Sequence, residues 1–282
     1  MTPRTTSLGE QVSRVPTRLG QLHVRTVGPA DGAPTVLWSS MFVDSHTWDP
    51  LLPLLPTDRR YFLVDPPGLG LSEPLRSASD IAGAADAAAD LLDGLDGLGV
   101  DGPVDWLGNA FGGHVGFKLA ARPGVLRSLV AVSSPVEPVD DALRKQIKVM
   151  LPILGVLGPV GPVRKAILDA MLTDASRAEA GVLGAVLDSL ARPRRRSMAL
   201  AVRSFILDRL DVTSEIGDIC VPSLFVASDD RGDWSPEDAE AAAGLTPQAT
   251  AVTIAAARTL VPLEQPAALA AEVVRFWSSL ES

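Results

Sequence analysis

The sequence predicts an α/β fold in which a mostly parallel central sheet carries helices on both faces and receives one inserted group of helices. Short apolar, β-branched segments alternate with amphipathic helical segments along most of the chain, which is typical of a parallel sheet covered on both sides. The alternation stops between residues 135 and 213, where helical patterns follow one another without a strand. A glycine-rich turn at residues 108–113 joins one apolar segment directly to a helix. Together these observations predict one large α/β domain with a helical insertion.

The elements before the insertion follow from local patterns. Two alternating segments flank Gly20 within residues 12–26 and predict a hairpin. Residues 49–55, with their prolines, predict a short helical turn. The other expected elements are strands at 34–39, 61–65, 104–107 and 126–133 and helices at 81–98 and 114–121.

The insertion and the end of the chain complete the predicted fold. Within the insertion we expect helices at 140–151, 163–172, 178–190 and 196–210. After it we expect strands at 222–227 and 250–254 and helices at 236–243 and 266–280. We therefore divide the chain into a core made of residues 1–134 and 215–282 and a helical cap made of residues 135–214.

The most apolar stretch of the chain, residues 149–163, belongs to this cap. It is interrupted repeatedly by proline and glycine, so it falls short of the roughly 20 unbroken apolar residues that a membrane span needs. We expect it to form part of a lid or a cavity wall, and we expect no membrane span.

Charge and composition exclude several functions. A formal net charge of -9 argues against nucleic-acid binding, which requires a basic face. The single cysteine, Cys220, cannot form an internal disulfide, and residues 1–18 contain no apolar segment of signal-peptide type. We therefore expect a cytoplasmic protein with no metal and no cofactor, and its abundant Ala, Gly, Pro and Arg suggest a bacterial source; the oligomeric state stays open.

The most informative segment is VDWLGNAFGGHVG, at residues 104–116. An apolar strand, a tight glycine turn and a helix have the shape of a nucleophile elbow, in which G-x-S-x-G holds a serine hydroxyl above the sheet on a strained turn. Here the five places hold Gly108 to Gly112, and Ala110 occupies the nucleophile place. A methyl group cannot attack a carbonyl carbon.

Four blocks in order make the chain similar to the α/β-hydrolase fold superfamily from about Val15 onward. The blocks are VLWSSM at 36–41, DPPGLGLS at 65–72, the elbow, and LFVASDD at 224–230 followed by ARTLVPLE at 257–264. The inserted helices stand where this superfamily carries its cap. The resemblance therefore implies an α/β-hydrolase fold with a helical cap.

Carried over from this resemblance, the catalytic triad is incomplete. The nucleophile place holds Ala110, and the histidine place, five residues before Glu264, holds Thr259. Only the acid place keeps its residue type, at Asp230, with Asp229 as the adjacent alternative. In a comparable triad, loss of the nucleophile or the base lowers turnover about 10⁶-fold. We expect covalent acyl transfer by the usual route to be negligible.

The resemblance also implies an oxyanion hole and a ligand cavity. Its donors are the main-chain N–H groups of Met41 and Phe111, which do not depend on side-chain identity. If both N–H groups converge on one point, they could stabilise an enolate or oxyanion without a nucleophile. The side chains expected to bind ligand between core and cap are Ser39, Ser40, Phe42, His46 and Trp48.

The polar groups of this expected site have competing interpretations. His46 is the histidine that we expect at the cavity, although a loop residue capping the following turn fits the same position. His114 lies one turn beyond Ala110, and we interpret it as packed against the neighbouring helix or sheet.

Three functions remain open. The first is a natural member that binds a hydrophobic small molecule and either holds it or promotes isomerisation, cyclisation or elimination without a covalent intermediate. The second is a true ester or carbon–carbon bond hydrolase with an engineered Ala110 or a non-standard nucleophile. The third is a non-enzymatic protein that binds a partner through the old lid surface. Because Ala110, Thr259 and Ser39 depart from the superfamily pattern together, we favour the first.

Overall fold

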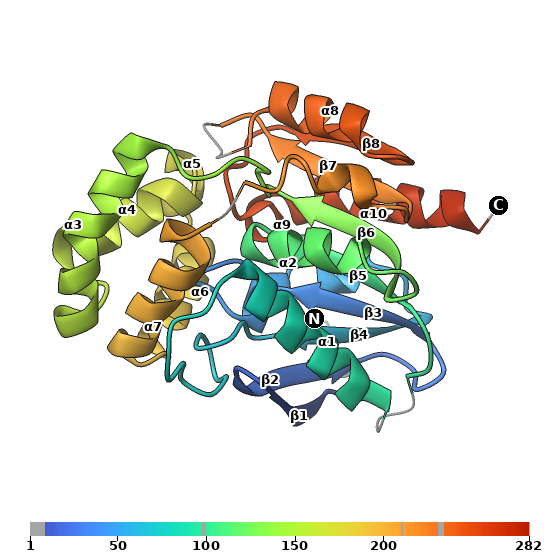
Figure 1. The fold of residues 1–282 in the computed structure, drawn as a ribbon, viewed down its shortest axis with the longest axis horizontal. Coiled ribbons are helices and arrows are strands. Elements are labelled where there is room, and N and C mark those ends of the chain that lie inside the picture. The colour runs from blue at the N-terminus through green and yellow to red at the C-terminus, as the bar shows by residue number, and fades with distance from the viewer. Residues whose placement is uncertain (1–8, 97–99, 210, 231–233, 282) are drawn as a thin grey trace, which may run out of the picture.

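The structure is a computed structural model that describes residues 9–96, 100–209, 211–230 and 234–281. Eight strands form one sheet in the order β1-β2-β4-β3-β5-β6-β7-β8 (Figure 1). β2 is antiparallel to both β1 and β4, and every other neighbouring pair is parallel. The strands are β1 (Gln11–Thr17), β2 (Gly20–Val27), β3 (Ala33–Trp38), β4 (Arg59–Val64), β5 (Val104–Asn109), β6 (Leu126–Val132), β7 (Ser223–Ser228) and β8 (Ala249–Ile254).

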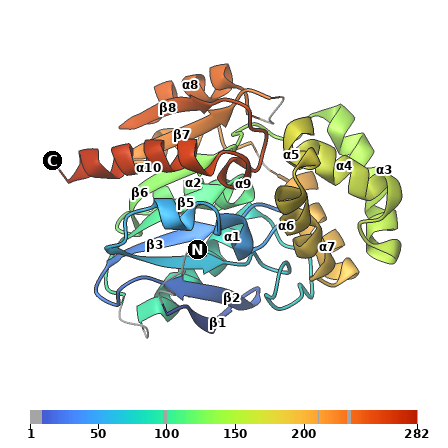
Figure 2. The same ribbon diagram turned by 180° about the vertical axis from the view of Figure 1, so that it is seen from behind.

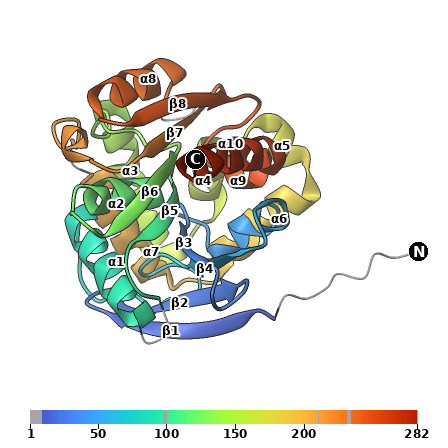
Figure 3. The ribbon, with the colours of Figure 1, turned by 90° about the vertical axis from the view of Figure 1, so that its right-hand side faces the viewer.

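Helices cover both faces of this sheet, as Figure 3 shows. On one face lie α1 (Ile81–Asp96), α2 (Phe111–Ala120) and α8 (Pro236–Leu245), and on the other lie α9 (Val261–Glu264) and α10 (Pro266–Leu280). The mostly parallel sheet with helices on both faces confirms the predicted fold class.

The buried side chains of the strands alternate between two cores. Along β3, Val36 and Trp38 belong to the core beneath α1 and α2, while Leu37 belongs to the core beneath α10. This alternation follows from the two-residue period of a strand, which sends successive side chains to opposite faces. Because β4, β5 and β7 are buried along their whole length, most of their residues are apolar.

The inserted helices lie between β6 and β7 in the chain. They are α3 (Asp141–Leu157), α4 (Gly161–Met171), α5 (Asp174–Ala178), α6 (Ala180–Ala191) and α7 (Arg195–Val202). Figures 1 and 2 show them together at one end of the sheet, with α3 farthest from it. We call this group the cap helices.

Several element boundaries differ from the sequence expectation. The helix expected at 196–210, for example, is α7 followed by a π-helix at Arg203–Leu207. α2 begins at Phe111, directly after the turn, rather than at 114. α3 continues through Pro152 to Leu157, although a proline inside a helix removes one hydrogen bond. Leu154, beyond that proline, is buried in the core shared with the cap helices, and this packing holds the last turns of α3 in place.

No single helix among the described residues combines the length and hydropathy of a membrane span. α3 and α4 pass that test only as a pair, by length and composition, and a bend of 120° separates them.

Candidate functional site

The turn between β5 and α2 has the backbone geometry of a nucleophile elbow. Ala110 adopts φ +47° and ψ -104°, a conformation that costs a residue with a Cβ about 1–3 kcal/mol. Its N–H donates to the Val132 carbonyl at 2.7 Å, and its own carbonyl accepts from the Gly113 and His114 N–H groups. The turn is therefore formed in full around a methyl side chain.

Close packing of backbone against backbone holds this turn. A Cβ on Gly112 would lie 2.1 Å from the Trp38 carbonyl oxygen, and one on Gly108 would lie 2.2 Å from the carbonyl carbon of Gly112. Trp106 Nε1 donates to the Gly112 carbonyl at 2.9 Å. Glycine is required at both positions because only its absent side chain allows the helix to start so close to the strands.

Thr259 lies beside the elbow, where the superfamily pattern places its histidine. Asn109, the residue before Ala110, is fully buried and donates from Nδ2 to the Thr259 carbonyl at 2.8 Å. The Thr259 hydroxyl donates to the Ala170 carbonyl in α4 at 3.0 Å. A threonine hydroxyl does not take up a proton near neutral pH, so it cannot replace an imidazole as a general base.

Asp230, which the sequence resemblance places at the acid position, is paired with an arginine. Arg258 donates from Nη2 to the Asp230 carboxylate and from Nε to the Asp230 carbonyl, both at 3.1 Å. Arg258 Nη1 also donates to the Asp169 carbonyl in α4. Arg258, adjacent in sequence to Thr259, thus forms an ion pair with Asp230. In a complete triad the carboxylate at this place would instead orient a histidine.

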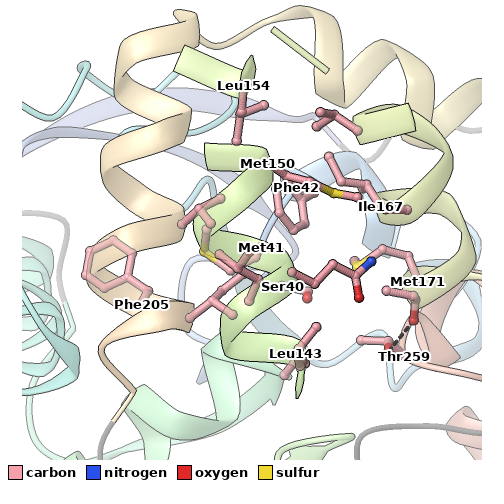
Figure 4. A pocket seen from close by; sticks show the side chains of 18 of the residues that line it. Ser40, Met41, Phe42, Leu143, Met150, Leu154, Ile167, Met171, Phe205 and Thr259 are labelled. Atoms are coloured by element: carbon pink, nitrogen blue, oxygen red, sulfur yellow. Dashed lines mark hydrogen bonds between the residues drawn. The ribbon is translucent and has the colours of Figure 1, made fainter. Parts of the chain in front are cut away.

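A cavity of about 530 Å³ lies between the elbow and the cap helices. Its floor includes Ala110 and Phe111, and its walls come mainly from α3 and α4. Figure 4 shows that its labelled side chains are mostly apolar, with Thr259 and Leu154 toward opposite ends. The apolar side chains from the insertion that line it include Leu143, Ile147, Met150, Leu151, Leu154, Val163, Ile167, Met171 and Phe205.

Ten residues were expected at catalytic, oxyanion-hole or ligand-binding places, and the structure brings six of them to this cavity. They are Ser40, Met41, Phe42, Ala110, Phe111 and Thr259. Phe42 also has a positive φ of 67°, so the loop after β3 is strained where it meets the cavity. Phe111 stacks on Phe205 of the insertion with ring centroids 4.5 Å apart, which joins the elbow to the opposite wall.

Ser39 and Trp48, expected to bind ligand, do not line the cavity. Trp48 is completely buried in the core beneath α10, on the other face of the sheet, and donates from Nε1 to Ser39 Oγ at 2.9 Å. Ser39 Oγ donates in turn to the Val64 carbonyl at 3.3 Å. Both side chains therefore stabilise the loop after β3 and do not face the cavity.

His46 does not line the cavity either. Its Nδ1 lies 3.0 Å from Asp44 Oδ1, and Asp44 also accepts from Arg192, the C-cap residue of α6. Burial opposes ionisation of Asp44, but the hydrogen bonds from His46 and Arg192 lower its pKa to about 2. The hydrogen bond to Asp44 raises the pKa of His46. This cluster fastens the cap helices to the core, and sequence patterns cannot reveal it because Asp44 and Arg192 are 148 residues apart.

His114 packs where the sequence suggests and also reaches the cavity wall. Its Nε2 lies 2.8 Å from the Pro135 carbonyl, so Nε2 carries the proton and Nδ1 does not. Burial, with the charge of Arg209, lowers the pKa of His114 to about 3 despite this hydrogen bond. The imidazole is therefore neutral at physiological pH. No group of three or more metal-ligating side chains occurs among the residues that the structure describes.

The sequence pattern decides the family. Residues 32–272 match the alpha/beta hydrolase family. The chain belongs to this family. The match includes the loop after β3, the elbow, the insertion and the loop that holds Thr259.

Two curated relatives share about a third of their aligned residues with this chain. A pimeloyl-[acyl-carrier protein] methyl ester esterase of Neisseria meningitidis serogroup A is 33% identical over 189 residues, which cover 64% of this chain and 56% of that enzyme. A protein of the same description from serogroup C is 33% identical over 194 residues, which cover 64% of this chain and 68% of that enzyme. The chain thus spans little more than half the length of the first relative.

Solved structures of the family share the fold across almost the entire chain. A thermophilic esterase from Thermogutta terrifontis has a TM-score of 0.84 at 20% identity, covering 96% of this chain and 100% of that one. An enol-lactonase from Burkholderia xenovorans has a TM-score of 0.84 at 21% identity, covering 94% of this chain and 100% of that one. At these identities the likeness establishes the fold alone.

Proposed function

We propose that this protein binds an apolar small molecule bearing a carbonyl-type oxygen in the cavity between the elbow and the cap helices, and that it forms no covalent acyl intermediate. The observation that carries the proposal is that the elbow has its strained backbone conformation while the residue at the turn, Ala110, has only a methyl side chain. Ala110 supplies no nucleophile, Thr259 supplies no base, and both line the same apolar cavity.

The main-chain donors supply the polar end of this proposed site. Phe111 is the first residue of α2, and N–H groups in the first turn of a helix have no partner within the helix. The Phe111 N–H, with the helix dipole behind it, favours a partial negative charge on the ligand. Isomerisation, cyclisation or elimination through a stabilised enolate would need no nucleophile at Ala110.

A second function, hydrolysis of an ester or lactone, is favoured by two observations. Ser40 lines the cavity beside the proposed oxyanion donor Met41, and the similar proteins include named esterases and an enol-lactonase. Under this alternative Ser40 is the candidate nucleophile. Loss of ester turnover on Ser40→Ala would favour this alternative over binding alone.

Filling the cavity tests the proposed binding site. Ala166, half-buried on α4, lines the cavity, so Ala166→Phe should weaken binding of methyl octanoate about tenfold or more by occupying its volume. Isothermal titration calorimetry measures the affinity. Ala142→Phe is the matched control, because Ala142 is exposed on α3 and is not among the cavity-lining residues. Equal affinity in both variants, or no binding by the unaltered chain, would contradict the proposal.

A further inference from the structure

The outer face of α3 carries an unusual concentration of exposed apolar side chains. Ten large apolar residues are exposed among the described residues, and five of them lie between 149 and 160. Val149 and Val156 are 71% and 70% exposed. The apolar stripe, as we call it, consists of Val149, Ile153, Val156 and Leu157 of α3 and of Val160, which precedes α4.

α3 is apolar on two opposite sides, of which the protein covers one. Ile147, Met150 and Leu154 line the cavity on the inner side, while Val149, Ile153 and Val156 repeat at helical spacing on the outer side. α3 is the outermost of the cap helices in Figures 1 and 2. Exposed apolar clusters of this kind mark interaction surfaces.

The charge around the stripe is opposite in sign to that of the rest of the protein. Residues 140–209 contain twelve Lys and Arg against seven Asp and Glu, a net charge of +5, while the whole chain carries -9. Lys145 and Lys148 are exposed on α3, ahead of the stripe. At its other end, Arg195 is exposed and donates from Nη1 to the Val156 carbonyl at 3.1 Å. The stripe is therefore bordered by cations.

The charge and the hydropathy of this surface together favour one kind of binding partner. A second copy presenting the same face would bring two positive regions together. An anionic lipid surface instead offers negative headgroups to the cations and acyl chains to the stripe, which is how amphipathic helices bind membranes in the interfacial plane.

We propose that the apolar stripe and its bordering cations dock this protein on an anionic lipid surface, with α3 lying among the headgroups. This docking places the cavity, whose wall is the inner side of α3, directly behind the lipid-facing surface. The inference does not depend on what the cavity does, because it concerns the opposite side of the helix.

Vesicle flotation tests the docking surface. The full chain is mixed with vesicles of phosphatidylcholine alone or of phosphatidylcholine with phosphatidylglycerol. We expect it to float with the anionic vesicles and to be released by salt. Val149→Ser/Val156→Ser should weaken this binding about tenfold or more by removing the buried apolar area, and Lys145→Glu/Lys148→Glu should weaken it by a similar factor.

Two matched variants serve as controls. Val12→Ser/Leu245→Ser removes two exposed apolar side chains that lie outside the insertion. Arg76→Glu/Arg275→Glu reverses two exposed positive charges, also outside the insertion. Both should bind anionic vesicles like the unaltered chain. Because all substituted side chains are exposed, circular dichroism should show unchanged folding.

Several results would overturn the proposal. These are no flotation with anionic vesicles, equal binding to neutral and anionic vesicles, or equal losses in the stripe and control variants. A dimer in sedimentation velocity that Val149→Ser/Val156→Ser abolishes, without vesicle binding, would assign the stripe to a second copy instead. Since the readout is vesicle binding, failure here leaves the ligand-binding proposal intact, and the reverse also holds.

Discussion

The elbow and the loop around Thr259 both contribute to the cavity, yet different kinds of contact hold them in place. At the elbow the backbone keeps its strained turn around Ala110, with φ +47°. In the other loop the side chains form different contacts, since Arg258 pairs with Asp230 and Thr259 bonds to Ala170 of the insertion. The elbow depends on glycine and main-chain packing, whereas an acid–base pair depends on side chains alone. The elbow is therefore held mainly by its backbone, and the loop around Thr259 mainly by its side chains.

The largest expected effect comes from breaking the backbone packing of the elbow. Gly112→Ala would place a Cβ 2.1 Å from the Trp38 carbonyl, and because backbone cannot move aside, we expect a loss of about 3 kcal/mol or more in the free energy of unfolding. Urea denaturation measures the change.

Gly184→Ala provides the contrast to that substitution. Gly184 lies within α6 with nothing within 4 Å of its added Cβ, so we expect a gain of about 0.5–1 kcal/mol. Similar stabilities for Gly112→Ala and Gly184→Ala would show that close packing does not hold the elbow.

A smaller loss is expected in the loop around Thr259. Arg258→Met removes the hydrogen bonds to the Asp230 carboxylate and carbonyl and to the Asp169 carbonyl, so we expect unfolding to require about 2 kcal/mol less. Arg275→Met, at an exposed i,i+3 pair, should change stability by about 0.5 kcal/mol or less. Equal effects of the two substitutions would mean that the Arg258 contacts are not structural.

The elbow helix should also make stability depend on pH through His114. Its pKa is about 3 in the folded protein and about 6.5 when unfolded. Below pH 6.5 the unfolded chain binds a proton that the folded chain does not, so stability falls as pH falls. Between pH 6.5 and 5.5 this group should contribute a loss of about 1 kcal/mol.

The comparison with His114→Leu isolates this contribution. Because leucine does not titrate, urea denaturation of that variant at pH 6.5 and 5.5 should show a smaller decline than the unaltered chain. Parallel declines would place the pH dependence in other groups.

Features that depend on short sequence patterns could be predicted from the sequence. Features that depend on which face of the sheet a loop side chain packs against could not. Most strands are short, mainly apolar segments, and the elbow is a continuous segment, so both were predictable. Trp48 looks like a cavity residue in sequence, but it packs beneath the other face of the sheet against the core of α10. Arg258 is next to Thr259 in the sequence, yet only the structure reveals its ion pair with the Asp230 carboxylate.

The apolar residues of the insertion illustrate the same limit. The stretch at 149–163 was expected to form a cavity wall, and Met150, Leu151 and Leu154 do line the cavity. Val149 and Val156 instead face outward. Composition indicates that this stretch is apolar, but the division between its two sides follows from how α3 is rotated against α4 and α7.

Ester turnover tests the central claim most directly, namely that the elbow keeps its shape without a reactive group. Short-chain nitrophenyl esters are incubated with the unaltered chain and with its Ala110→Ser/Thr259→His variant, alone and combined with Arg258→Met to release Asp230. We predict that the unaltered chain matches the buffer blank and that turnover appears in the double variant, increasing when Arg258 is also replaced. Turnover well above the blank by the unaltered chain would contradict the account and would direct attention to Ser40.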